Sequence, residues 1–234
     1  MPYRRFPKTD TARLNSIRTL LDNNDVYAAN KRFIDIDLIN KVKAYQEQLK
    51  SLCNNFRLCY DAQMDNYRCI AKPQKRMMMY VQHFMRVLDM SIERGEIKPT
   101  ALQTFYTVDD INETLRLLHN ADDAYRLTPN IIEGEKKRIA QGGRPIYNNP
   151  TIGMVATHYD IFKDIYEQQH IMNEKADRAL AELKALRAKL DPIIVDIWNQ
   201  VEAHFAELPP ETRFDECRKY GLIYYYRTGE KKPE

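Results

Sequence analysis

The longest regular pattern of apolar positions in the chain lies between residues 151 and 208. Apolar side chains recur there at steps of three and four residues on either side of a polar middle, from Ile152 to Tyr166 and from Ala176 to Phe205. This spacing keeps one stripe on one side of an α-helix, so it predicts a buried helical seam. Asp191-Pro192 interrupts the seam, because a carboxylate before a proline is typical of a helix start. The pattern leaves open whether the helix kinks near Leu190 or ends there in a short turn.

A second periodic pattern covers residues 35–96. Its first apolar positions alternate steps of four and three residues, at Leu38, Val42, Tyr45, Leu49, Leu52, Phe56 and Cys59, and the same steps continue through polar Gln63 and Asn66 to Ile70. Steps of this kind, sustained over about four heptads, predict a long helix with one coiled-coil-like seam. Lys72-Pro73 interrupts this pattern as Asp191-Pro192 interrupts the other one. Both halves therefore share a plan of long helix, proline and shorter helix, which leaves duplication of the chain as an open alternative.

The rest of the chain carries shorter signals. Residues 1–34 predict an extended, proline-punctuated arm and a short helix capped at Thr9 or Asp10. The connection 97–150 is too long for a structureless loop, so we expect at least two helices in it, one of them capped at Thr107. Residues 209–234 predict a short helix and a tail with strand composition at 222–226. Extended ends stay ordered by docking or pairing, so we expect the arm and the tail to lie side by side, with their tyrosines packed on the bundle.

These patterns together predict an all-α protein. We expect an elongated bundle of four long antiparallel helices with short accessory helices and a small terminal β-pairing, its core formed by segments 36–70, 74–96, 152–190 and 192–207. The expected organisation is a single domain over residues 1–234. Its parts are the arm and first helix (1–34), a helical hairpin or kinked helix (35–96), the connection (97–150), a second hairpin or kinked helix (151–208) and the C-terminal helix and tail (209–234).

Composition narrows the classes of function. Of the 234 residues, 44% are hydrophobic, 29% are charged and only 7 are glycine, as is typical of a soluble helical protein. The 36 basic and 33 acidic residues leave a net charge of +3, so the charge of the whole chain does not favour nucleic acid or an anionic membrane surface as a partner. No apolar run approaches the ~20 residues of a membrane span. The 4 cysteines lack C-x-x-C spacing, which favours reduced thiols and a cytoplasmic location.

One pair of residues has the spacing of a metal site. Glu167-Gln-Gln-His170 places a carboxylate and an imidazole on one helix face, as in the di-iron carboxylate bundles. Such centres need a second Glu-x-x-His pair and further glutamates, and the chain has no second copy of the motif. Glu167 and His170 are therefore candidate metal ligands, with a solvated helix face as the simpler alternative. We expect no cofactor.

A glycine pair suggests an anion site. Gly142 and Gly143 precede Arg144 and follow a basic run, and consecutive glycines let backbone N–H groups surround an anion that an arginine also binds. No phosphate-binding glycine motif is present, however. The commoner reason for such a pair is a helix C-terminus followed by a turn. Gly142, Gly143 and Arg144 are thus candidate ligand residues with a structural alternative.

Tyrosine and arginine gather at both ends of a chain that contains 15 tyrosines. The residues concerned are Tyr3, Arg4 and Arg5 in the arm and Tyr224, Tyr225 and Tyr226, before Arg227, in the tail. Exposed rings beside arginines form a stacking surface for single-stranded nucleic acid. The alternative, which the nearly neutral charge favours, is that alternate tyrosines pack on the bundle while the others cover an edge. The run Met77–Met79 suggests an adaptable binding groove, although helical periodicity places one or two of the three in the core.

Several stretches of the sequence carry a resemblance. They are the opening Met-Pro-Tyr-Arg-Arg-Phe-Pro-Lys-Thr-Asp-Thr-Ala-Arg-Leu (1–14), Gly-Gly-Arg-Pro-Ile-Tyr-Asn-Asn-Pro (142–150), His-Tyr-Asp-Ile-Phe-Lys (158–163), Ile-Trp-Asn-Gln-Val-Glu-Ala-His-Phe (197–205) and Cys-Arg-Lys-Tyr-Gly-Leu-Ile-Tyr-Tyr-Tyr (217–226). Over most of its length the chain resembles a functionally uncharacterised helical protein family of gut Bacteroidetes. The resemblance implies a lineage and a helical fold, and it brings no activity, substrate or catalytic residue.

The function that these observations favour is a non-enzymatic interaction or scaffold protein that presents helical faces to a protein partner, which we expect to be a second copy of itself. A ferritin-like metal-binding bundle and a nucleic-acid-associated protein that uses its basic and aromatic termini are the two alternatives.

Overall fold

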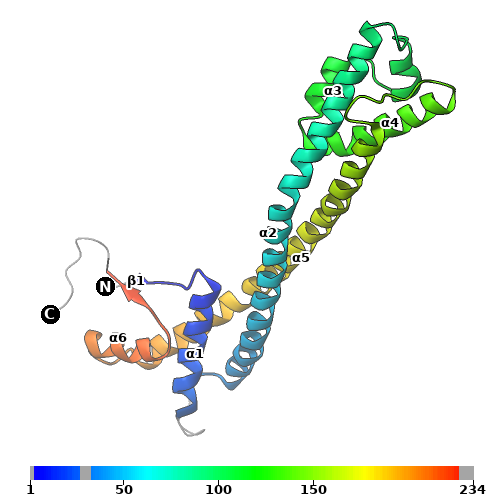
Figure 1. The fold of residues 1–234 in the computed structure, drawn as a ribbon. Helices are drawn as coiled ribbons and strands as arrows, with labels where there is room; N and C mark the ends of the chain where they lie inside the picture. Colours follow the sequence, from blue (N-terminus) through cyan, green and yellow to red (C-terminus); the bar gives the residue numbers. More distant parts are fainter. Residues whose placement is uncertain (1–2, 27–32, 227–234) are drawn as a thin grey trace. The chain divides into compact units, whose positions relative to one another are not determined.

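The computed structural model describes residues 3–26 and 33–226, and it shows an all-α fold with one small sheet (Figure 1). In chain order the elements are β1 (Tyr3–Arg4), α1 (Asp10–Val26), α2 (Ile36–Glu93), the π-helical turn η2 (Leu102–Tyr106), α3 (Ile111–Leu117), α4 (Ala121–Ala140), α5 (Ile152–His204), α6 (Pro210–Lys219) and β2 (Tyr224–Tyr225). The predicted helical fold class is confirmed. Within the described ranges, no helix combines the length and the apolar character that crossing a membrane requires.

Both long helices continue through their prolines. Pro73 lies inside α2 and Pro192 lies inside α5, so the four predicted segments are in fact two continuous helices. A proline removes the hydrogen bond to the carbonyl one turn earlier, which here belongs to Cys69 or Ala188. Both of these residues are exposed, so water can replace the missing donor. The alternative of a turn at either proline is therefore wrong, because each helix continues through its proline.

Contacts within the chain divide it into two compact units. The first unit comprises Met1–Tyr60 with Lys175–Glu234, and the second comprises Asp61–Glu174. Each unit therefore contains one part of α2 and one part of α5. The sequence-based boundaries at 96 and 151 do not separate these units, and the single domain over 1–234 stays a prediction.

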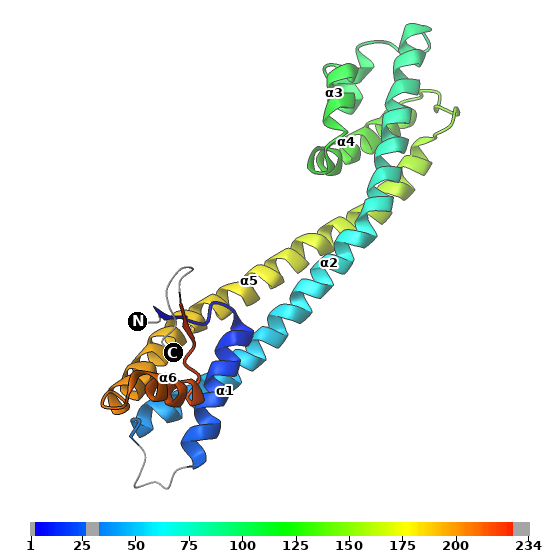
Figure 2. The same cartoon turned by 90° about the vertical axis from the view of Figure 1, so that its left-hand side faces the viewer.

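The first unit surrounds the beginning of α2 and the end of α5 with α1 and α6. Figure 2 shows α1 beside α6, and the two helices are in contact. Ion pairs hold α1 against α5: Asp10 accepts from Arg187 Nε at 2.7 Å, and Arg13 Nε donates to Asp191 at 2.7 Å. The apolar core includes Ile17, Leu20, Val42, Leu49, Leu183, Leu190, Ile194, Ile197, Trp198, Val201 and Cys217.

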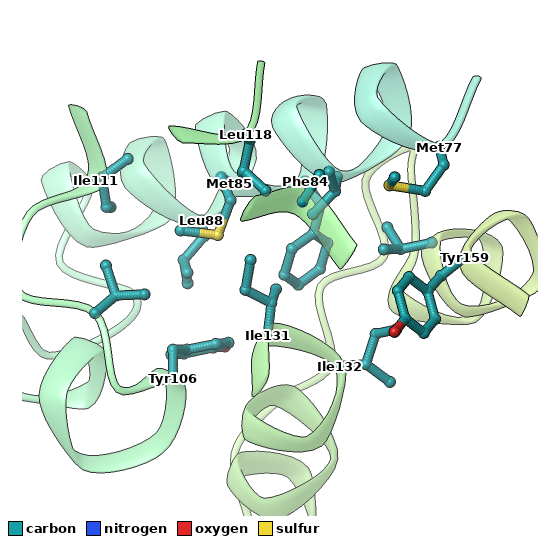
Figure 3. Packing of buried hydrophobic residues seen from close by; sticks show 14 of the residues in the cluster. Met77, Phe84, Met85, Leu88, Tyr106, Ile111, Leu118, Ile131, Ile132 and Tyr159 are labelled. Carbon is teal, nitrogen blue, oxygen red and sulfur yellow. The ribbon is translucent and has the colours of Figure 1, made fainter. Parts of the chain in front are cut away.

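The second unit has its own core between the end of α2, the start of α5, and α4. Figure 3 shows Phe84, Met85 and Leu88 of α2 gathered around Ile131 of α4 and Tyr106 of η2. The turn η2 packs closely on α4, and this approach requires a glycine at position 134. A Cβ atom added there would lie only 2.4 Å from the carbonyl oxygen of Phe105. Other members of the core are Met77, Val81, Ile97, Ile111, Leu118, Val155, Tyr159, Phe162 and Tyr166.

The connection 97–150 contains helices, as predicted, but its helix starts differ from the expected ones. Thr107 ends η2 in a left-handed conformation (φ 55°), and Asp110 caps α3 by accepting from the Asn112 amide. Helix α4 starts at Ala121 and runs through Pro129. The proline leaves the carbonyl of Tyr125 without an amide donor, and Tyr159 Oη donates to that oxygen at 3.0 Å. A side chain from α5 thus satisfies a group that local sequence leaves unpaired.

Candidate interaction groove at the paired termini

The two ends of the chain form one antiparallel ribbon in the first unit. Tyr3 pairs with Tyr225 and Arg4 with Tyr224, and the Arg5 amide donates to the Ile223 carbonyl at 2.7 Å. The predicted side-by-side arrangement of the arm and the tail is confirmed, and it forms within one chain. The strands are visible near the label β1 in Figure 1.

The tail reaches the arm through Gly221, which follows the end of α6 at Lys219 and occupies a position that only glycine fills well. Gly221 has a φ of +83°, a conformation in which a side chain is strained, and an added Cβ would lie 2.4 Å from the Ser16 carbonyl oxygen. The hydroxyl of Ser16 donates to the Gly221 carbonyl at 3.0 Å. This close approach of the tail to α1 turns the chain toward β1 immediately after α6.

One face of the ribbon is bound to the helices. Tyr224 Oη donates to Glu202 Oε1 at 2.6 Å, and burial raises the pKa of this tyrosine. Arg4 donates to Asn199 Oδ1 at 2.8 Å and lies 3.3 Å from Glu202. Arg4 and Tyr224, both candidate interaction residues, therefore anchor the ribbon to α5.

The other face of the ribbon is open. Tyr3 and Tyr225 have 37% and 43% of their surface exposed, with ring centroids 5.9 Å apart, and Arg5 is exposed beside them. The expectation that the terminal tyrosines pack on the bundle is wrong for these two rings, because successive residues of a strand point to opposite sides. Tyr226 is half-buried, and Arg227 lies outside the described residues.

A groove of about 620 Å³ runs beside this open face. It is lined by Arg4, Arg5, Phe6, Pro7, Lys8, Thr9, Ala12, Ile223 and Tyr225. Among the lining residues that the structure describes, three are cations and none is acidic. The nearest acidic residue in sequence, Asp10, is held by Arg187 and Arg13 instead. Within the described part of the chain, the side chains of Arg5 and Lys8 have no hydrogen-bond or ion-pair partner.

The candidate metal ligands lie in the second unit, on an exposed face of α5. Glu167 accepts from Tyr125 Oη at 2.7 Å and lies 3.8 Å from Lys163 Nζ. The exposed ring of His170 meets Tyr166 edge-on, with centroids 5.0 Å apart. In residues 3–26 and 33–226, no three His, Cys, Asp or Glu side chains are grouped in a way that could hold a metal ion. The structure therefore does not bring further ligands to Glu167 and His170.

The candidate anion residues end α4. The amide of Gly142 donates to the Ile139 carbonyl at 2.9 Å, and the amide of Gly143 donates to the Arg138 carbonyl at 3.0 Å. With Gly142 at φ +90°, this is the Schellman arrangement that closes many helices. Both N–H groups are used within the protein, which leaves neither of them for an anion. The side chain of Arg144 is exposed, and its carbonyl accepts from Arg138.

The most polar buried cluster of the second unit escaped the sequence analysis. Arg138 donates to both oxygens of Glu135 at 2.8 Å, and Tyr106 Oη donates to the same carboxylate. Glu135 is 1% exposed and Arg138 is 6% exposed, and burial raises the pKa of Tyr106. The available signal was helical spacing, since Glu135 and Arg138 follow Ile131 at steps of four and three residues and therefore share the helix face of this buried isoleucine. Because the cluster satisfies its own charges and also holds the carbonyl of Arg144, we assign it a structural role.

The methionine run divides between core and surface. Met77 is completely buried, while Met78 and Met79 line a shallow hollow of about 420 Å³ on the second unit with Ala71, Gln74, Lys75, Gln82 and His119. Lys75 is the one charged residue among the lining residues, so the hollow has less charge to select a ligand than the terminal groove has.

Comparison of the chain with models of known protein families, with curated proteins and with solved structures gives no match. The resemblance to a helical family of gut Bacteroidetes therefore stays a prediction. What can be said of function rests on the geometry of the chain itself.

Proposed function

We propose that this chain is a non-enzymatic protein-interaction module and that the terminal groove is its docking surface. The observation that carries the proposal is that Arg5 and Lys8 have no side-chain partner among the described residues and line a hollow whose other lining residues are largely apolar. Charge complementarity steers a partner and apolar contact retains it, so this combination suits a protein surface. The polar side chains at the groove are cations, a threonine and a tyrosine, which supply binding contacts rather than a nucleophile with its base.

Self-association is part of the proposal, at a surface other than the groove. A two-fold axis brings the same patch of both copies together, so a dimer through the groove sets like charges against each other. The first unit has another candidate for this surface on α2, where the apolar residue Leu58 has 70% of its surface exposed. Light scattering tests this part, because a species of 27.7 kDa at every concentration contradicts it. We place the module in the cytoplasm because the cysteines Cys53, Cys59, Cys69 and Cys217 are all free thiols.

Single-stranded nucleic acid is the second candidate partner. The open ribbon face supports it, since two exposed tyrosine rings stand beside Arg5, and bases stack on such rings. Against it, the net charge of the chain is only +3, whereas binding to phosphates depends on a clustered positive excess. We therefore rank protein above nucleic acid.

A capture experiment with matched variants tests the proposal. The full chain, immobilised, is exposed to extract of its own cells with and without nuclease, beside Arg5→Glu, Tyr225→Ala and the control Lys41→Glu. Lys41 is an exposed cation of the same unit that does not line the groove. We expect a protein that the unmodified chain and Lys41→Glu retain, and that both groove variants lose. Equal retention by all four chains would show that the groove is not the docking surface, and loss on nuclease treatment would favour nucleic acid.

A further inference from the structure

We infer that the terminal groove accepts an extended acidic segment of a partner protein. The inference rests on the proposed function and adds to it the chemistry and the conformation of the partner. Three features of the groove carry it: the balance of charge in its lining, its apolar floor, and the unpaired backbone along one wall.

The charge in the lining is of one sign. In the described part of the chain, Arg4, Arg5 and Lys8 line the groove without any carboxylate, and Glu202 offsets only the charge of Arg4. The two remaining cations attract a carboxylate each, and the guanidinium of Arg5 can hold one in a bidentate geometry. The groove thus offers two positions for acidic side chains along its rim.

The floor of the groove is apolar and well supported. Phe6, Pro7, Ala12 and Ile223 contribute to it, and the ring of Phe6 packs on buried Trp198 with centroids 5.8 Å apart. A floor fixed in this way needs little rearrangement before it binds, which lowers the entropic cost of association. A volume of about 620 Å³ has room for a few side chains rather than for a folded surface. We therefore expect an aliphatic or aromatic side chain between the acidic residues.

The backbone of the arm determines the conformation of the partner. Residues 6–8 are neither helical nor part of the ribbon, and the amides of Phe6 and Lys8 donate to no described residue. Unpaired amides on an extended segment are suited to main-chain pairing with another extended chain. A partner that binds as a helix cannot accept hydrogen bonds from these amides, because the N–H and C=O groups of a helix are already paired with each other. An extended segment fits the groove better.

Nucleic acid fits this groove less well than an acidic peptide does. Its phosphates suit Arg5 and Lys8, but its charged backbone gains nothing from the floor at Phe6 and Pro7. The ribbon tyrosines can stack on bases, and for that reason the experiment includes a single-stranded oligonucleotide as a probe.

Fluorescence anisotropy with the full chain tests the inference. The main probe is a labelled short peptide in which glutamates alternate with leucine and phenylalanine. The comparison probes replace the glutamates by lysine, replace the apolar residues by glycine, or consist of oligothymidylate. We expect the first probe to bind and the others to bind at least tenfold more weakly. The double variant Arg5→Gln/Lys8→Gln should weaken the first probe about tenfold or more, since each charged hydrogen bond contributes at that scale, and Lys41→Gln should leave it unchanged.

Each other outcome overturns the inference. If the acidic peptide does not bind, or binds the double variant equally well, the partner is not acidic. If the glycine probe binds as well as the main probe, the apolar lining of the groove does not contribute to binding. Tighter binding of oligothymidylate that also depends on Arg5 replaces the peptide by nucleic acid. If the groove variants lose a captured protein while no acidic peptide binds, the proposed function stands and this inference fails. Amide exchange at Arg5, which donates to Ile223, checks that the ribbon of each variant is intact.

Discussion

The two compact units treat their charged residues differently. In the second unit, Arg138 and Glu135 stand three residues apart on one helix, where both are buried and form an ion pair with each other. In the first unit, the ion pairs that join α1 to α5 connect residues far apart in sequence, such as Asp10 and Arg187, which are separated by 177 positions. The first unit also leaves the side chains of Arg5 and Lys8 exposed, with no partner in residues 3–26 and 33–226. Its surface therefore retains charge for a ligand, whereas the buried cluster of the second unit uses its charge to hold the fold.

This difference also separates the ways in which the units close. The second unit consists of one continuous stretch, and its polar cluster ties α4 to the turn η2 and to the carbonyl of Arg144. The first unit closes only when both ends of the chain meet. Its groove forms by that closure, because the ribbon brings Arg5 of the arm and Ile223 of the tail together in the groove lining. A binding surface built in this way exists only in the complete fold.

The largest expected effect comes from breaking the buried cluster of the second unit. Glu135→Ala leaves Arg138 charged and buried without its carboxylate, so the free energy of unfolding should fall by about 3–5 kcal/mol. Urea denaturation measures the change. Glu133→Ala is the matched control, because Glu133 is an exposed glutamate on the same helix, and it should change stability by less than ~0.5 kcal/mol. Similar losses in both variants would mean that the cluster contributes nothing specific.

The stability of the first unit depends instead on its apolar seam. Alanine substitutions of two neighbouring leucines, one buried and one half-buried, measure how much the seam contributes. Leu49 is completely buried, so Leu49→Ala should cost about 2–5 kcal/mol. Leu52, one step further along the heptad, is only half-buried, and Leu52→Ala should cost less because fewer contacts are lost. Thermal melts of the two variants give the order. If Leu52→Ala costs as much as Leu49→Ala, something covers the half-buried position in solution.

A smaller effect should appear in alkaline solution. Burial raises the pKa of Tyr159 and of Tyr166, both in the second unit, from 10.0 to about 12. Between these values the unfolded chain loses protons that the folded chain retains, so stability is complete below pH 10 and falls as the pH rises toward 12. Denaturation at stepped pH with tyrosinate absorbance follows both events. Tyr166→Phe should make the decline shallower; an unchanged slope would assign the effect to other groups.

The smallest effect concerns the ribbon itself. Without residues 1–7, the tail loses its pairing partner, so amide exchange at 222–226 should accelerate while the core of α5 stays protected. The change in global stability should be modest, because a two-stranded ribbon contributes little by itself. Hydrogen exchange followed by mass spectrometry measures exchange at 222–226 and protection of the core of α5 separately. Fast exchange at 222–226 already in the full chain would show that the pairing is too weak to shape a groove.

Local patterns predicted much of what the structure contains. Steps of three and four residues located the long helices, and the glycine pair at 142–143 was correctly offered as a helix end. The meeting of the termini was predicted because an arm and a tail with no helical pattern have unpaired backbone groups. Other features could not be found locally. The carbonyl left free by Pro129 is satisfied by Tyr159 from another helix, and nothing near the proline in sequence indicates this partner.

The candidate site divides in the same way. The sequence placed arginines and tyrosines at both ends, but it could not tell which of them anchor the ribbon and which remain free. Arg4 and Tyr224 bind α5, whereas Arg5 and Tyr225 border the groove. This assignment follows from the register of the ribbon, since a shift by one residue exchanges the two faces of a strand.

The sequence by itself determined the helices and their buried faces, because periodic apolar positions act over a few residues and need no distant partner. Only the tertiary structure decided that the helices continue through Pro73 and Pro192, that Glu135 and Arg138 are buried together with Tyr106, and that a cationic groove forms between the ends of the chain. Each of these depends on burial or on contact between residues far apart in the chain. Their energies are set by desolvation and by partners that meet only after folding, which no local pattern encodes.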